Sequence, residues 1–347
     1  MRLVFVFLLL IIFSCKKENE SNSDFRNELF PYLNRLSKEK MLPVSDTVAK
    51  NYLYKNATKE ELIRLMNSEI PLLRVVAYRL IIDREEPEYF DLLMNNLDDQ
   101  AKVQWWYYED AAGYFSVSDL MIAKAKDKDG FSPIQKKVLV DKVLLYYPEL
   151  EVSNEMLRDI EPNKRYYNLI KERAILKSKN DRCGIQLGAC FALSKFKKEE
   201  DVKVLKKVFE ENFEGYCTEW IFKSIEKFPH QQFFPLLKQY FESKVKNKLN
   251  SENNISDEVL YFSRAVAAYQ DDKSLDILKY IEQNNTFINK PFWPPSNKAY
   301  VLKATMIHYN EIYNDLISDI KKQMDDCEIK NLGFGKDLLE YEDRQYW

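Results

Sequence analysis

Glycine is scarce in this chain: only 7 of its 347 residues are glycine, which is about 2% where roughly 7% is usual. Folds that need many positions with positive φ, such as Gly-turn-rich barrels, Rossmann phosphate loops and P-loops, depend on glycine. Hydrophobic residues make up 46% and charged residues 31% of the chain, which is typical of a globular protein and not of a disordered one. The composition therefore favours helices that are joined by turns without glycine.

The N-terminus has the pattern of a secretion signal. Met1 and Arg2 precede an uninterrupted apolar run over residues 3–13. As a helix this run is about 16 Å long, which is too short to cross a hydrocarbon core about 30 Å thick. We therefore predict that residues 1–14 are a signal peptide. A short signal anchor is the alternative.

The end of the apolar run, Ile12-Phe13-Ser14-Cys15, resembles the lipobox of bacterial lipoproteins. The resemblance implies cleavage before Cys15, diacylation of its thiol and acylation of its new amine. Two or three acyl chains hold a protein stably at a membrane, and the polar residues 15–24 would form a flexible tether. A cluster of Lys and acidic residues directly after the cysteine resembles the surface-export signal of Bacteroidetes lipoproteins. It implies an outer-membrane lipoprotein on the cell surface, with the periplasmic face as the alternative.

Downstream of the tether, apolar residues recur at helical spacing in segments that short polar or proline-bearing turns separate. Thr58 precedes one such segment, with two carboxylates in its first turn. Pro71 stands at the start of the next, where a proline is tolerated. We expect residues 25–57 to form an N-terminal helical cap and residues 326–347 to form a C-terminal tail.

Several segments between these ends resemble one another as pairs of helices. The clearest pair is 181–196 with 199–205, and looser copies are 219–228 with 233–241, 258–269 with 275–281, and 299–309 with 312–320. Small residues at matching places are spaced by 32, 41 and 39 residues, and they are Ala192, Ser224, Ala265 and Ala304. These spacings lie near the period of about 40 residues that helical-pair repeats show, and short side chains let neighbouring helices approach closely.

The pattern resembles HEAT repeats over residues 58–325. It predicts an all-α fold, an α-solenoid of antiparallel helical pairs, with a non-repetitive helical bundle as the alternative. The register is hardest to follow between residues 98 and 180, where residues 105–125 and 133–147 are both expected to be helical.

The sequence carries no signature of a catalytic or metal site. The only histidines, His230 and His308, are far apart, and no Cys-x-x-Cys, His-x-x-x-His or Glu-x-x-His spacing occurs. Gly-x-Ser-x-Gly, Walker A and kinase signatures are absent too. We therefore assign no catalytic residue, metal or cofactor. The formal net charge of −3 gives no bulk attraction to nucleic acid.

Aromatic residues are the one surplus, at 14% of the chain. The densest cluster is Trp105, Trp106, Tyr107 and Tyr108. On a helix four consecutive residues cannot all face the core, so one or two of them should be exposed. Trp293, in a proline-rich loop, is a further candidate. Exposed Trp and Tyr favour the binding of a partner because they offer a large contact area at little entropic cost, and they can stack on a sugar ring; core filling is the alternative.

Four cysteines remain after Cys15, and in an extracytoplasmic compartment they can pair. Cys183 and Cys190 are seven residues apart, about 10.5 Å along one helix, which is beyond disulfide reach. Cys190 could reach Cys217 if their helices are neighbours. The alternative is that all four, Cys327 included, are small buried apolar residues.

Together these features predict a lipid-anchored extracytoplasmic binding or scaffold protein whose solenoid surface holds a protein, peptide or glycan. An immunity-type lipoprotein that neutralises an incoming toxin is a specific version. The competing class is an enzyme, a helical hydrolase or lyase that acts on cell-envelope polymers. Such an enzyme needs carboxylates, or His230 or His308 with a carboxylate, converging in one deep pocket.

Overall fold

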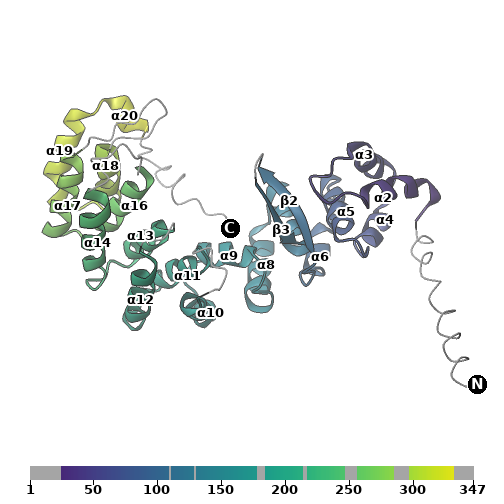
Figure 1. Cartoon of the computed structure of the whole chain (residues 1–347), viewed down its shortest axis with the longest axis horizontal. Coiled ribbons are helices and arrows are strands. Elements are labelled where there is room, and N and C mark those ends of the chain that lie inside the picture. Colours follow the sequence, from purple (N-terminus) through teal and green to yellow (C-terminus); the bar gives the residue numbers. More distant parts are fainter. Residues whose placement is uncertain are drawn as a thin grey trace, which may run out of the picture. The chain divides into compact units, whose positions relative to one another are not determined.

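The computed structural model describes residues 25–108, 111–128, 130–177, 184–213, 217–246, 256–284 and 297–331. Cys15, Cys183, Trp293 and most of the C-terminal tail lie outside these ranges. The described chain is mostly helical, as expected, and contains one small three-stranded sheet. It divides into two compact units, Met1–Ser153 and Asn154–Trp347 (Figure 1). The division lies inside the range 58–325 that the sequence assigned to a single run of repeats.

The first unit consists of short helices around a small sheet. Its helices are η1 (Asn27–Leu29), α2 (Phe30–Leu36), α3 (Thr47–Asn56), α4 (Lys59–Leu65), α5 (Pro71–Asp83), α6 (Tyr89–Met94), α7 (Val117–Lys128) and α8 (Pro133–Tyr146), and α9 (Val152–Asp159) begins at its end. The strands are β1 (Met41–Leu42), β2 (Lys102–Tyr108) and β3 (Ala111–Ser116), in the order β1-β2-β3. Strand β1 is parallel to β2, and β2 is antiparallel to β3.

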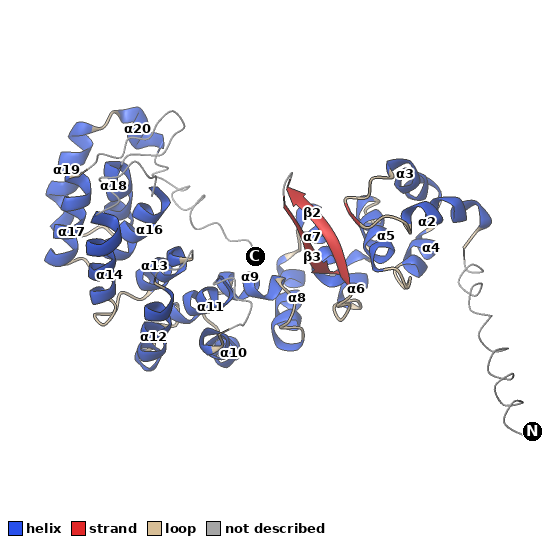
Figure 2. Cartoon of the chain, in the orientation of Figure 1, coloured by secondary structure: helices blue, strands red, loops and turns tan. Residues whose placement is uncertain are grey.

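The sheet corrects one expectation from the sequence. Residues 105–116 were expected to be helical, but they form the hairpin of β2 and β3 (Figure 2), while α7 and α8 confirm the helices expected after it. A run of bulky aromatic residues suits a strand, because successive side chains point to opposite faces. Trp105 pairs with Gly113 and Trp106 pairs with Ala112, so each indole lies opposite a small residue. That pairing across the hairpin is not visible in the helical spacing of apolar residues.

The helix starts in this unit follow the local signals. Thr58 and Glu61 form a reciprocal capping box: the Thr58 hydroxyl accepts from the Glu61 N–H at 3.2 Å, and the Glu61 carboxylate accepts from the Thr58 N–H at 2.7 Å. Pro71 is the first residue of α5. Both arrangements satisfy or remove N–H groups that have no partner inside the helix.

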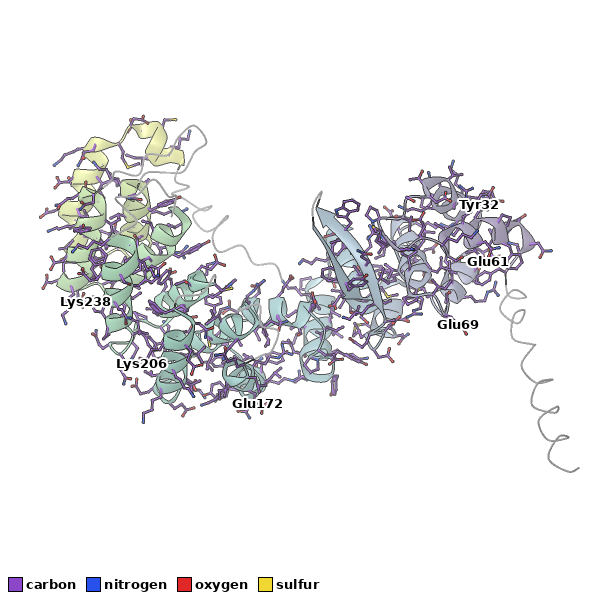
Figure 3. All side chains as sticks on the ribbon, in the orientation of Figure 1. Tyr32, Glu61, Glu69, Glu172, Lys206 and Lys238 are labelled. Carbon is purple, nitrogen blue, oxygen red and sulfur yellow. The ribbon has the colours of Figure 1, made fainter. Side chains whose placement is uncertain are left out.

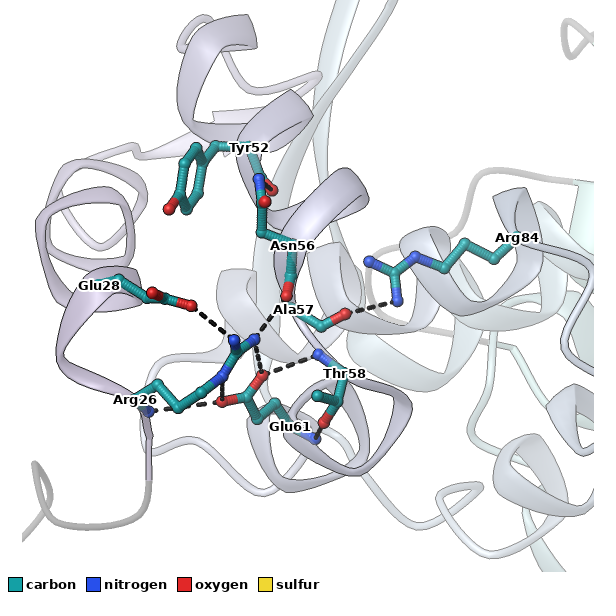
Figure 4. A network of polar contacts seen from close by, with 8 residues as sticks. All are labelled: Arg26, Glu28, Tyr52, Asn56, Ala57, Thr58, Glu61 and Arg84. Carbon is teal, nitrogen blue, oxygen red and sulfur yellow. Dashed lines mark hydrogen bonds and ion pairs between the residues drawn. The ribbon is translucent and has the colours of Figure 1, made fainter.

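A network of polar contacts joins the beginning of the described chain to these helices (Figure 4). Arg26 donates to both carboxylate oxygens of Glu61, in each case at 2.9 Å, and to the carbonyl of Asn56 at 2.5 Å. Arg84, which follows α5, donates to the carbonyls of Leu53 at 2.7 Å and Ala57 at 2.8 Å. These carbonyls lie in the last turn of α3 and at the residue that follows it, so Arg26 and Arg84 bind the C-terminal end of α3, and Arg26 also binds Glu61 at the start of α4.

In its described residues the second unit contains helices and no strand, and α9 ends within it. Its other helices are α10 (Lys164–Ile175), α11 (Gly184–Ser194), η2 (Glu199–Asp201), α12 (Val202–Asn212), α13 (Thr218–Lys227), α14 (Phe234–Tyr240), a π-helical turn η3 (Phe241–Val245), α16 (Ser256–Ala267), α17 (Asp272–Gln283), α18 (Asn297–Ile307), η4 (Glu311–Tyr313), α19 (Asn314–Gln323) and α20 (Asp326–Asn331).

Four of these helices, α11, α13, α16 and α18, pack against one another in this order, and we call them the main row. Helices α12, α14, α17 and α19 alternate with them along the chain, and each packs against at least one helix of the main row. Each segment that the sequence assigned to a helical pair therefore contains a helix. The resemblance of these pairs to HEAT repeats stays a prediction.

Residue size and polarity account for this packing. The four small residues at matching places, Ala192, Ser224, Ala265 and Ala304, all lie on the main row and are all buried. In α12 the apolar residues Val202, Leu205, Val208 and Phe209 are buried, whereas Lys206, on the other side of this helix, pairs with Glu210 at 3.5 Å (Figure 3). Helix α14 is built in the same way, with Lys238 exposed. One apolar stripe per helix thus faces the neighbouring helices.

The scarcity of glycine has a visible consequence at helix ends. Glu85, Lys197 and Gln270, which follow α5, α11 and α16, adopt left-handed conformations with φ between 50° and 62°. This conformation ends many helices and usually belongs to glycine. The chain therefore turns at these points with residues that carry a conformational cost. Among the described residues, none of the helices is long and apolar enough to cross a membrane.

Candidate functional site

The β2–β3 hairpin presents two exposed aromatic side chains on one face. Lys102, Gln104 and Trp106 alternate along β2, and their partners across the hairpin are Ser116, Tyr114 and Ala112. Cross-strand partners share a face, so Trp106 and Tyr114 are diagonal neighbours on the same side of the sheet. Trp106 is 48% exposed and Tyr114 is 65% exposed. We call this side, with Gln104, Trp106, Ala112 and Tyr114, the aromatic face.

The opposite side of the hairpin faces inward and holds it in place. Val103 is buried, and Trp105 meets Phe115 edge to face, with ring centroids 5.4 Å apart. The aromatic residues thus alternate between the two faces of the hairpin along each strand. One set anchors the hairpin to the unit, and the other is presented outward.

Buried hydrogen bonds fix the base of the hairpin. The Ser116 hydroxyl donates to the Asp119 carboxylate at 2.6 Å and accepts from the Asp119 N–H at 3.0 Å, and both residues are buried. Asp119 also accepts from the backbone N–H of Val152 at 3.1 Å. The junction of β3 with α7 is therefore tied to the start of α9, and the strands have a rigid support.

The candidate binding residues from the sequence are partly brought together here. Trp105 is half-buried and Trp106 is exposed, which agrees with the expectation that one or two of the cluster face solvent. Tyr107 and Tyr108 belong to β2, but their side chains lie outside the described set. Sequence reasoning missed Tyr114, whose signal was its place in a second β-forming run shortly after the Trp105–Tyr108 cluster.

A second surface, in the second unit, escaped the sequence analysis. It combines cations with aromatic rings on α9, α11, α13 and α16, and its members are Arg158, Phe191, Lys195, Trp220, Lys223 and Tyr261. The Lys223 nitrogen lies 4.5 Å from the ring centroids of both Trp220 and Tyr261. The Arg158 guanidinium lies 4.9 Å from the Trp220 centroid. A cation is attracted to the face of an aromatic ring, so the contacts of Arg158 with Trp220 and of Lys223 with Tyr261 help to hold α9, α13 and α16 together.

Gly188 makes room for part of this surface. A Cβ atom at this position would lie 3.1 Å from Cγ of Arg158, which is closer than ordinary van der Waals contact. A larger residue at position 188 would therefore require the Arg158 side chain to shift by a few tenths of an ångström.

A buried charge cluster connects three helices of the main row. Arg264 on α16 donates to Oε1 of Glu226 on α13 at 2.9 and 3.1 Å, and Nε2 of His308, at the end of α18, lies 2.8 Å from the same oxygen. Burial raises the pKa of Glu226, but hydrogen bonding to His308 and the charge of Arg264 outweigh it and hold the pKa well below its usual range. A carboxylate with a lowered pKa is a weak proton acceptor.

The other histidine also faces a carboxylate, since Nε2 of His230 lies 3.1 Å from Glu199. Neither histidine lines the cavity of about 220 Å³ that α5 and α7 help to form, beside Glu85 and Glu86. Ligand pockets measure roughly 300–1,000 Å³, so this cavity is small. Within the described ranges, no group of three His, Cys, Asp or Glu side chains could hold a metal ion.

The described cysteines fall into three environments. Cys190 is a buried thiol and Cys327 an exposed one, whereas Cys217 is disulfide-bonded. A bond between Cys190 and Cys217 is thus ruled out. The alternative that all four are buried apolar residues is also wrong, although it describes Cys190.

No family model, no curated protein and no solved structure matches this chain. The geometry of its own residues must therefore carry the functional argument.

Proposed function

We propose that this chain is an extracytoplasmic binding protein, anchored through lipid on Cys15 at the outer membrane. The cell surface is favoured over the periplasmic face. Its helical pairs, resembling HEAT repeats, are the scaffold, and its partner is a protein, a peptide or a glycan; an immunity-type lipoprotein is one version.

The aromatic face of the hairpin is the observation that carries this proposal. Trp106 and Tyr114 are large, adjacent and outward, although the same hairpin buries other apolar side chains. Solvent exposure of two such rings has no benefit for folding, whereas rigid aromatic anchors dominate the energetics of binding. The support from Asp119 keeps them in place before a partner arrives, which lowers the entropic cost of binding.

Two further observations support the assignment of compartment. The residues around Cys15 resemble a lipobox, and Cys217 is disulfide-bonded. Disulfides persist in oxidising compartments and are rare in the cytosol. The enzyme alternative has less support, because Glu226, the carboxylate beside His308, is buried, and neither histidine lines the cavity beside Glu85 and Glu86.

Crosslinking in intact cells tests the binding function. We expect a stoichiometric partner to be captured by the wild-type chain and to be lost with Trp106→Ala plus Tyr114→Ala. Tyr146→Ala is the matched control, because Tyr146 is 69% exposed on α8, outside the hairpin. Equal capture by the double variant and the control would refute the proposed role of the hairpin.

Membrane attachment is tested separately with Cys15→Ala. We expect loss of palmitate labelling and release from the membrane fraction, whereas Cys327→Ala, which removes an exposed thiol, keeps both. If Cys15→Ala stays in the membrane fraction with unchanged labelling, the lipid anchor is refuted.

A further inference from the structure

We infer that the outer edge of β3 is where an extended peptide segment of the partner adds a fourth strand to the sheet. This inference rests on the proposed binding function and names how the partner is held. The described sheet has the order β1-β2-β3, and β3 pairs only with β2. Its other edge directs backbone N–H and C=O groups outward, as every edge strand does.

The two edges of this sheet differ in how they are protected. Strand β1 is two residues long and Pro43 follows it directly, so a partner strand finds little to pair with. Strand β3 is six residues long and contains no proline and no charged residue. Natural proteins blunt their edges with short strands, prolines and charges. The β3 edge has none of these defences, and an edge left open on a rigid support is a surface for β-strand addition.

The side chains beside this edge indicate the chemistry of the segment that binds. Ala112 and Gly113 are small, so another backbone can approach closely. Tyr114 would face a side chain of the added strand directly, and Trp106 lies one strand further in. The only charged residue of β2 and β3 is Lys102, at the far end of β2. We therefore expect a segment with apolar or aromatic residues on alternate positions and no charge at its centre.

An added strand accounts for the hairpin better than stacked sugar does. A stacked sugar ring would use Trp106 and Tyr114 alone, whereas the unprotected edge runs along the whole of β3. A second copy of this chain, paired edge to edge, is the other occupant, and the test below separates it from a partner segment.

The test uses the full lipidated chain in detergent and a phage-displayed library of random 12-residue peptides. Proline is placed at Ala112 in one variant and at Gly113 in another. Neighbouring residues of a strand direct their N–H groups to opposite edges, so one of the two variants loses only an outward donor and keeps the Tm of the wild type. Enriched peptides should bind that variant at least about tenfold more weakly and should protect the amides of residues 111–116 of the wild type from hydrogen exchange.

Three results overturn the inference: no enriched peptide, peptides that bind both proline variants as tightly as the wild type, or protection that falls outside residues 111–116. A concentration-dependent dimer that the same variant abolishes would also overturn it, in favour of a second copy. If the Trp106→Ala plus Tyr114→Ala variant loses crosslinking in cells while no peptide binds, the proposed binding function is supported and the added strand is refuted. If the double variant is crosslinked as efficiently as the wild type, the proposed binding function of the hairpin is refuted as well.

Discussion

Arg26 and Glu61, 35 residues apart in sequence, form a two-pronged ion pair in which each contact measures 2.9 Å. The pair lies where the tether predicted from the sequence meets the folded chain, and Glu61 caps α4 at the same time. If Cys15 carries the proposed lipid anchor, a pull on the N-terminus would reach the fold near this contact.

Loss of the Glu61 charge should weaken the first unit. We expect Glu61→Gln to lower the free energy of unfolding by about 1–2 kcal/mol, because charged hydrogen bonds contribute roughly this much and Arg26 is half exposed. Chemical denaturation, followed by hydrogen exchange in α4, measures the change. Glu28→Gln is the control: it removes a solvent-exposed partner of Arg26, and a loss as large as that of Glu61→Gln would contradict the account.

The same pair should make stability depend on pH in acid. Hydrogen bonds from Arg26, assisted by the Thr58 N–H, outweigh burial and lower the pKa of Glu61 from 4.5 to about 2. A lowered pKa in the folded state stabilises the fold fully above pH 4.5, and this stabilisation disappears as the pH falls from 4.5 towards 2. The difference in Tm between the wild type and Glu61→Gln should shrink across that window; a constant difference would exclude the mechanism.

Glycine at a left-handed helix end should stabilise the second unit. Lys197 has a φ of 50°, a conformation that costs a non-glycine residue about 1–2 kcal/mol. Glycine avoids this cost, but its larger conformational entropy in the unfolded state offsets part of the gain in stability. We expect Lys197→Gly to raise the free energy of unfolding by up to about 1 kcal/mol. Lys207→Gly, in the exposed middle of α12, should lower it by about 1 kcal/mol. The same sign for both substitutions would disprove the strain at Lys197.

Breaking the buried charge cluster should cost much more than breaking an exposed one. Glu226 is 3% exposed and Arg264 is 1% exposed, so Glu226→Ala removes a buried carboxylate that binds a buried guanidinium. We expect a loss of about 3–5 kcal/mol, measured by hydrogen exchange in α13, α16 and α18. Glu199, the carboxylate beside His230, is 76% exposed. Glu199→Ala should therefore have no resolvable effect on the free energy of unfolding. Similar losses in both variants would show that the cluster is not a specific link.

The cysteines should differ in reactivity as their environments differ. Cys327 is exposed and should be alkylated in the native protein, whereas Cys190, whose pKa burial raises, should react only after unfolding. Cys217 should react only after reduction and unfolding. Mass spectrometry with alkylation before and after each step gives all three results. Alkylation of Cys217 in the unfolded but unreduced chain would show that the disulfide is absent and would remove one support for export.

The helices of the second unit could be predicted because they depend on local signals. Apolar spacing located the pairs from α11 to α19, and the small residues Ala192, Ser224, Ala265 and Ala304 marked the helices that pack closely. Thr58 and Pro71 marked helix starts for the same reason, since a cap acts within one turn.

The candidate site could be predicted only in part. The sequence pointed to Trp105 and Trp106 as a group, but it placed them on a helix. Exposure repeats about every 3.6 residues on a helix and every two residues on a strand, so a helix does not predict which of these side chains faces outward. Their strand conformation depends on pairing with β1 and β3, which lie before and after them in the chain. That pairing also supplied Tyr114 and the open edge.

The sequence by itself determined a helical, glycine-poor chain, because composition, caps and apolar spacing act over a few residues. Only the tertiary structure decided which aromatic side chains face outward, and which charges are buried together. Glu226, Arg264 and His308 span 82 residues and meet at one carboxylate oxygen. Contacts of this range follow from the packing of whole helices, and no local pattern encodes them.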